Sequence, residues 1–115
     1  MKKVYHFGKC NTCQRILEEL NWDGESQEIR SEKITEQQLD EMATFAGSYE
    51  ALFSRRAIKY KTMKLKEKIA SEADYKQLIL EEDTFLKRPV FLINGAIFIG
   101  NTKKTVEAVQ AALNE

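Results

Sequence analysis

The two cysteines of the chain, Cys10 and Cys13, are separated by only two residues. A strand-like segment, 3–7, rich in β-branched and aromatic residues, precedes them, and apolar residues with helical spacing follow from Gln14 onward. A thiol at the start of a helix meets unpaired N–H groups and the positive end of the helix dipole, which stabilise a thiolate. A second thiol three residues later lies one turn away on the same face, within reach of a disulfide. The pattern predicts thiol–disulfide chemistry.

Basic side chains near Cys10 would lower the pKa of its thiol. His6 stands four residues before it, and we expect it to support the thiolate electrostatically. The other interpretation of His6 is a core histidine whose hydrogen bonds are satisfied. Arg88 and Arg56 are the further candidates, because a guanidinium grips a carboxylate or an oxyanion through two hydrogen bonds. Arg55 is the alternative to Arg56, and all of these arginines are open to interpretation as surface charges.

Two other interpretations of the cysteine pair remain. The first is a pair of inert, buried thiols. The second is a zinc site, of which Cys-x-x-Cys supplies half the ligands. Since the chain has no other cysteine and a single histidine, His6, a closed tetrahedral site would also need a carboxylate. We therefore predict no metal site.

Composition limits the class of protein. The chain has 115 residues, 43% of them hydrophobic and 31% charged, with a formal net charge of zero. This length predicts a single domain over residues 1–115. Zero net charge gives no reason to expect a nucleic-acid partner, and no apolar run approaches the ~20 residues of a membrane helix. Without a secretory signal we expect a cytoplasmic protein, where a close cysteine pair is catalytic, regulatory or metal-binding.

The segment 55–68 carries seven lysines and arginines against the single acidic residue Glu67. It is interpreted either as a docking surface for an acidic partner or as a solvated face balanced by acidic neighbours. Tyr60 is the one aromatic residue within it, so base stacking with single-stranded nucleic acid is not predicted.

The middle of the chain is predicted to be helical. A weakly patterned second strand is placed at 27–30. Thr35 and Gln38 form a capping box ahead of one helix, and Ser71 with Asp74 opens another. We expect helices throughout the segment of about 35–83.

The last third carries the clearest signals. Segment 90–93 is continuously apolar, as in a strand buried on both faces. Asn94-Gly95 is a strong hairpin signal, because both turn positions need positive φ, and 96–99 returns as the paired strand. Thr102 then caps a final helix.

The order strand, Cys-x-x-Cys, helix, strand, several helices, hairpin and helix is that of a thioredoxin-like α/β domain with a helical insertion. We predict a mixed, mostly four-stranded sheet with the insertion between the second strand and the strand after Pro89. Pro89 is the only proline. It is interpreted either as a cis proline lying against the reactive cysteine or as a trans proline that starts a strand.

Three sequence features resemble the arsenate reductase/Spx (ArsC-like) family of thioredoxin-fold proteins over nearly the whole chain. They are His6 four residues before Cys10, Arg56, and the pair Arg88-Pro89 before a buried strand. The resemblance implies that Cys10 is the nucleophile and that Arg56 and Arg88 hold an oxyanion. It also implies three to four inserted helices and a cis proline against the cysteine.

The sequence departs from the reductases of this family at two places. Asn101 stands where they carry a third anion-binding arginine, so arsenate itself is a doubtful substrate. Asn11 and Thr12 still supply polar groups to the loop as candidate substrate-binding residues. Cys13 is typical of Spx-type regulators, which use the Cys-x-x-Cys disulfide as a switch while binding RNA polymerase.

Two functions follow from this combination. The first is a reductase without a bound cofactor, with Cys10 as nucleophile and Cys13 as resolving thiol, re-reduced by glutathione, glutaredoxin or thioredoxin. Its substrate would be a small anionic or disulfide compound. The second is an Spx-like regulator in which the Cys10–Cys13 disulfide controls binding to RNA polymerase. His6 favours the enzyme, whereas Cys13 and Asn101 favour the regulator. We expect a monomer without membrane or direct nucleic-acid binding.

Overall fold

The computed structural model describes residues 2–115. Its contacts divide the chain into two compact units, one containing the segments up to Lys33 and from Arg88 onward, the other Ile34–Lys87. The prediction of a single domain over the whole length stays a prediction. Within the described residues no helix is long and apolar enough to cross a membrane.

The first unit is built on a mixed four-stranded sheet of order β2-β1-β3-β4. Strand β1 (Lys2–His6) pairs in parallel with β2 (Glu25–Glu28) and antiparallel with β3 (Val90–Ile93). Strand β4 (Ala96–Ile99) pairs antiparallel with β3. The predicted α/β class and mixed four-stranded sheet are confirmed.

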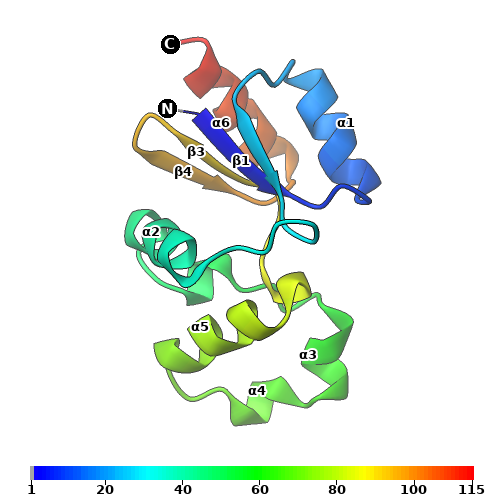
Figure 1. Cartoon of the computed structure of the whole chain (residues 1–115), viewed down its shortest axis with the longest axis vertical. Coiled ribbons are helices and arrows are strands. Elements are labelled where there is room, and N and C mark those ends of the chain that lie inside the picture. The colour runs from blue at the N-terminus through cyan, green and yellow to red at the C-terminus, as the bar shows by residue number, and fades with distance from the viewer. Residues whose placement is uncertain (1) are drawn as a thin grey trace. The chain divides into compact units, whose positions relative to one another are not determined.

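Helices α1 (Asn11–Glu19) and α6 (Lys103–Leu113) pack against one face of this sheet, as Figure 1 shows. Their buried contacts with β1 and β3 form one core, because alternate residues of a strand point to the same face. The buried members of this core are Val4, Ile16, Leu20, Phe91, Ile93 and Val109. This packing fixes the start of α1 relative to the end of β1, which is where the two cysteines lie.

The hairpin and the last helix begin where the sequence predicts. Asn94 and Gly95 have φ of 48° and 86°, as a tight turn between two strands requires. The hydroxyl of Thr102 accepts a hydrogen bond from the backbone N–H of Thr105 at 3.2 Å and caps α6. All four residues of β3 are buried.

The second strand has the length of the predicted 27–30 but lies two residues earlier. It spans Glu25–Glu28, because the side chain of its last residue ends the pairing. The Glu28 carboxylate accepts hydrogen bonds from the backbone N–H groups of Arg30 and Ser31, at 3.3 and 2.8 Å. These bonds turn the chain away from the sheet.

The regular elements of the second unit are helices, joined by turns and one isolated antiparallel bridge between Phe53 and Leu86, which confirms the helical insertion between β2 and β3. Thr35 and Gln38 form a capping box, and so do Ser71 and Asp74. Its elements are α2 (Glu36–Ala46), η1 (Glu50–Leu52), α3 (Ile58–Thr62), α4 (Leu65–Lys68), α5 (Glu72–Glu81) and η2 (Asp83–Phe85).

Aromatic packing centres this unit on Phe53, which is fully buried. Its ring contacts those of Tyr60, Tyr75 and Phe85, with centroids 5.9, 5.1 and 5.1 Å away. Edge-to-face and offset ring pairs of this kind stabilise a core beyond the area that they bury. The unit therefore has a core of its own.

The basic segment 55–68 forms the two short helices α3 and α4. Arg55 and Lys59 form ion pairs with Glu50 and Glu82 inside the unit. The side chain of Ile58 is 80% exposed at the start of α3. Both interpretations of this segment, docking surface and solvated face, stay predictions.

Candidate functional site

Cys10 is the residue immediately before α1. It holds an extended conformation as the N-cap, and its sulfur accepts a hydrogen bond from the backbone N–H of Cys13 at 3.4 Å. Its own N–H donates to the carbonyl of Phe7 at 3.2 Å, which closes the turn between β1 and α1. Cys10 is partly exposed and Cys13 fully buried, and both are free thiols. The nucleophile candidate is thus accessible while its neighbour is covered.

The pKa values of the two thiols are shifted in opposite directions. Burial by itself would raise the pKa of Cys10, but hydrogen bonds from the N–H and thiol of Cys13, with the guanidinium of Arg88, outweigh it and hold the pKa below its ordinary value. Burial, followed by the hydrogen bond that its thiol donates to Cys10, raises the pKa of Cys13 to about 11. At neutral pH the pair therefore presents one activated sulfur and one protonated sulfur.

Arg88 reaches the site from the bend two residues before β3. Its guanidinium carbon lies 3.9 Å from the centroid of the Phe7 ring, in a cation–π contact. The bond between Arg88 and Pro89 is cis, and Pro89 is buried. Arg88 is thus held beside Cys10 by a ring that lies in the same turn.

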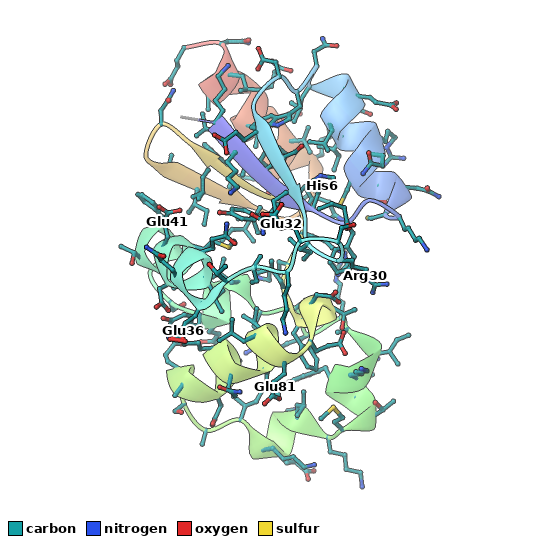
Figure 2. The ribbon with its side chains drawn as sticks, in the orientation of Figure 1. His6, Arg30, Glu32, Glu36, Glu41 and Glu81 are labelled. Atoms are coloured by element: carbon teal, nitrogen blue, oxygen red, sulfur yellow. The ribbon has the colours of Figure 1, made fainter. Side chains whose placement is uncertain are left out.

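Arg30 was missed by the sequence analysis. Its guanidinium carbon lies 4.7 Å from the centroid of the same Phe7 ring, and Figure 2 shows Arg30 in the loop that follows β2. The parallel register sets His6 opposite Glu28, so the residues after each strand become neighbours. No short sequence motif predicts the contact between Arg30 and Phe7, because this contact depends on strand register rather than on sequence spacing.

Glu28 was also missed. One oxygen of its carboxylate accepts a hydrogen bond from the backbone N–H of Gly8 at 2.8 Å, and the other accepts from Ser31 N–H and Oγ, each at 2.8 Å. A Cβ at Gly8 would lie 2.9 Å from Glu28 Cγ, so the small residue permits this approach. Glu28 therefore holds the turn that precedes Cys10 in place. The acidic residue at the end of a polar strand was the one available signal.

His6 contacts Gln14 rather than a cysteine. Its Nδ1 lies 3.3 Å from Gln14 Nε2, and that amide also donates to the carbonyl of Phe7 at 3.3 Å. The His6 side chain lies at the end of β1 in Figure 2 and lines an open groove with Gln14 and Trp22. The contacts that lower the pKa of Cys10 come from Cys13 and Arg88. The expected support of the thiolate by His6 stays a prediction.

The remaining predicted residues of the first unit surround the helix start. Asn11 is exposed and Thr12 partly exposed in the first turn of α1. Asn101, at the position of the missing arginine, is exposed in the turn before α6. Their roles in binding substrate stay predictions.

Arg56 belongs to the second unit, where it is exposed in a turn. The neighbouring Arg55 donates to Glu50 at 2.7 Å and to the Tyr75 hydroxyl at 2.9 Å. Arg55 is therefore engaged within that unit, which leaves Arg56 as the better candidate of the two. Its part in the site stays a prediction.

Metal ligation needs several donors at one place. Among residues 2–115 no group of three or more His, Cys, Asp and Glu side chains is arranged to hold a metal ion. What the described residues do provide around Cys10 is a set of hydrogen-bond donors and guanidinium groups. This arrangement suits a sulfur nucleophile and an anionic reactant.

The chain is similar to a known protein family and to several solved structures. The model of the ArsC family matches residues 5–109. Among solved structures the chain is similar to the YFFB protein, with 20% identity, a TM-score of 0.81 and 98% of this chain and 99% of that chain covered. It is also similar to arsenate reductase from Vibrio cholerae, with 17% identity, a TM-score of 0.77 and 96% of both chains covered. An ArsC-related protein from Brucella melitensis has 20% identity and a TM-score of 0.71, with 93% of this chain and 92% of that chain covered. At these identities the structures show a shared fold. No curated protein matches the chain.

Proposed function

The chain belongs to the ArsC family, and from this premise we propose that it is a thiol–disulfide oxidoreductase with Cys10 as nucleophile and Cys13 as resolving thiol. The observation that carries the proposal is the geometry of the pair: the partly exposed Cys10 sulfur caps α1 and accepts the N–H of the buried Cys13 at 3.4 Å. In keeping with it, the pKa of Cys10 is lowered and that of Cys13 is raised to about 11. Thiol–disulfide exchange in two steps needs one thiol that is reactive as a thiolate and a second, protonated thiol beside it that resolves the mixed disulfide.

In the first step the Cys10 thiolate attacks one sulfur of a substrate disulfide. A mixed disulfide forms between Cys10 and the substrate, the substrate S–S bond breaks, and the second substrate sulfur leaves as a thiolate that takes up a proton. The partial exposure of Cys10 permits this attack, whereas the buried Cys13 is shielded from it.

In the second step Cys13 loses its proton and attacks the sulfur of Cys10. The Cys10–Cys13 disulfide forms and the substrate thiol is released. Once Cys10 is capped it no longer carries the negative charge that helps to keep Cys13 protonated. Two molecules of glutathione, which become glutathione disulfide, or the dithiol of glutaredoxin or thioredoxin, which becomes a disulfide, then supply two electrons and two protons and restore both thiols, and no bound cofactor is required.

The two arginines named in the sequence have separate parts in this proposal. Arg88 lowers the pKa of Cys10 and orients an anionic substrate, since its guanidinium lies at the nucleophile. Arg56 is a second candidate for binding the anion. Asn11 and Thr12 are candidates for contacting the substrate at the start of α1, and Asn101 in place of an arginine argues against arsenate.

The test is a turnover assay with hydroxyethyl disulfide and with arsenate, in which the wild type is compared with Cys10→Ser. We expect turnover of the disulfide that is lost in the variant. If neither compound is converted faster by the wild type than by Cys10→Ser, the enzymatic function is wrong.

The second candidate is an Spx-like regulator, favoured by Cys13 next to an otherwise reactive Cys10 and by the absence of an arginine at Asn101. Because the Cys10 sulfur caps α1, its oxidation would change the surface at the start of this helix. Binding of purified RNA polymerase would be compared under oxidising and reducing conditions. Equal binding in both, or none, contradicts the regulator.

A further inference from the structure

We propose that the groove between α1 and α6 binds a small zwitterion of dipeptide size, with its carboxylate at the basic end of the groove and its ammonium group at the acidic end. The groove has a volume of about 360 Å³, within the usual range of small-molecule sites. This inference goes beyond the thiol chemistry of Cys10 and does not rest on it. The residues that carry it are Arg15, Ile16 and Glu19 of α1 and Lys103, Val106 and Glu107 of α6.

The two helices that form the groove run in the same direction. The strand register places Tyr5, Val90 and Ile99 side by side, near the end of β1, at the start of β3 and at the end of β4. Because α1 follows β1 and α6 follows β4, both helices begin at this end of the sheet. They pack against the same face of it (Figure 1). The groove between them therefore has the same direction as both chains.

The charged residues come in the same order on both helices. Arg15 stands four residues before Glu19 on α1, and Lys103 stands four residues before Glu107 on α6. At the rise of an α-helix, each acidic residue lies about 6 Å further along the axis than its basic partner. The groove thus has two basic groups towards the end where the helices begin and two acidic groups about one turn away.

This order of charges does not stabilise the helices. The helix dipole favours acidic residues in the first turn and basic residues in the last turn, and neither α1 nor α6 has either. A basic residue four positions before an acidic one also stabilises a helix less than the reverse order does. Charges that oppose the local preference of two neighbouring helices are expected where they serve a functional site.

The charged groups are available to a ligand. Arg15 and Glu19 are 3.9 Å apart, with side chains 69% and 59% exposed, so their ion pair is weak. The exposed side chains of Lys103 and Glu107 form no ion pair or hydrogen bond with any of residues 2–115. A ligand therefore meets these groups without first breaking a strong interaction.

The size of the ligand follows from the spacing of the charges. A dipeptide with free ends spans up to about 7 Å when it is extended, which matches the separation of about 6 Å along the groove. A free amino acid carries both charges on one carbon and cannot reach both ends. The buried Ile16 and the half-buried Val106 add apolar surface to the groove. The ligand class is therefore a dipeptide-sized zwitterion with an aliphatic side chain.

The experiment is a titration of the ¹⁵N-labelled protein followed by ¹H–¹⁵N correlation spectra at neutral pH and low salt. The probes are glycyl-leucine, its N-acetyl derivative, its C-terminal amide and free leucine. We expect glycyl-leucine to give saturable shifts of amides around Ile16 and Val106. Each of the other three probes should bind about fivefold more weakly or less, because each loses one of the two charge contacts. These differences should become smaller at high salt.

The variants are Lys103→Met and Glu107→Gln, with Lys104→Met and Glu18→Gln as controls. The control residues are exposed on the same two helices and do not line this groove. We expect both groove variants to weaken the binding of glycyl-leucine about fivefold and both controls to leave it unchanged. The same spectra report whether each variant is folded.

The orientation of the ligand is tested by combining variants and probes. In Lys103→Met, glycyl-leucine and its C-terminal amide should bind with nearly equal affinity, because the partner of the carboxylate is lost. In Glu107→Gln the same should hold for glycyl-leucine and its N-acetyl derivative. The opposite assignment, in which Lys103→Met removes the effect of N-acetylation, would overturn the proposed orientation.

Three results would overturn the site itself. They are an absence of saturable shifts in the wild type at millimolar glycyl-leucine, equal affinities of the wild type for all four probes, and an equal loss of affinity in the control variants.

Discussion

The Glu28 carboxylate accepts a hydrogen bond from the backbone N–H of Gly8 across 2.8 Å, although 20 residues separate the two in the chain. The contact ties the end of β2 to the turn that presents Cys10. The same carboxylate accepts three further hydrogen bonds, from Arg30 N–H and from Ser31 N–H and Oγ. A single side chain thus joins two loops of the first unit.

Replacing Glu28 by Gln should destabilise the protein. The amide has one acceptor oxygen in place of two, so some of the four donors lose their partner, and we expect a loss of about 1–2 kcal/mol in the free energy of unfolding at pH 7. Urea unfolding followed by circular dichroism measures it. The matched control is Glu25→Gln on the same strand, where the side chain is exposed. Equal losses in both variants would contradict the anchoring role.

Acid should weaken this anchor in a defined pH range. Burial opposes ionisation of Glu28, but hydrogen bonds from Gly8, Ser31 and Arg30 lower its pKa from an ordinary value of 4.5 to about 2. A carboxyl with a depressed pKa stabilises the fold fully above its unfolded pKa, and that contribution disappears as the pH falls towards the folded pKa. After allowance for solvent screening we expect about 1–2 kcal/mol to be lost in this way.

The measurement is the unfolding free energy of wild type and Glu28→Gln between pH 6 and pH 2. The difference between the two proteins should be largest above a pH of about 4.5 and should shrink towards pH 2. A difference that stays constant over this range would show that the carboxylate charge contributes nothing.

Arg88 should set the pH at which Cys10 becomes reactive. Its guanidinium is one of the groups that lower the pKa of Cys10 against the effect of burial. In Arg88→Met the rate of iodoacetamide labelling should therefore rise with pH at a higher inflection, and the rate at pH 7 should fall. Labelling rates over pH 5–10 measure the shift, with Arg15→Met as the control. An unchanged inflection would remove Arg88 from the activation of the thiol.

Local signals in the sequence were enough for several elements of the fold. The turn at Asn94-Gly95 and the caps at Thr35 and Thr102 each depend on residues within a few positions of one another. Strand β2 was misplaced by two residues because its end is set by Glu28, whose partner Gly8 lies far away in sequence. Short-range patterns do not report such a contact.

In the candidate site, too, features set by local sequence spacing were predicted and features set by distant contacts were not. Cys10 at the helix start and its lowered pKa were predicted from spacing and helix geometry. Arg30 was missed because it meets Phe7 only through the parallel register of β1 and β2. The support of the thiolate that we expected from His6 stays a prediction. Its contact with Gln14 was not predicted, because side chains on a strand alternate between faces and spacing alone does not fix their partners.

The proposed resolving role of Cys13 gives a prediction about a trapped intermediate. Its sulfur donates to Cys10 and is fully buried, so it is placed to attack a mixed disulfide on Cys10. In Cys13→Ser, treatment with glutathione disulfide should leave a stable glutathione adduct on Cys10. In the wild type the product should be the Cys10–Cys13 disulfide.

Because intramolecular attack is strongly favoured over attack from solution, turnover in Cys13→Ser should fall about tenfold or more. Intact-protein mass spectrometry identifies both species, and Cys10→Ser, which should form neither, is the control. Undiminished turnover in Cys13→Ser would mean that a thiol from solution resolves the adduct and that Cys13 serves only as a hydrogen-bond donor to the nucleophile.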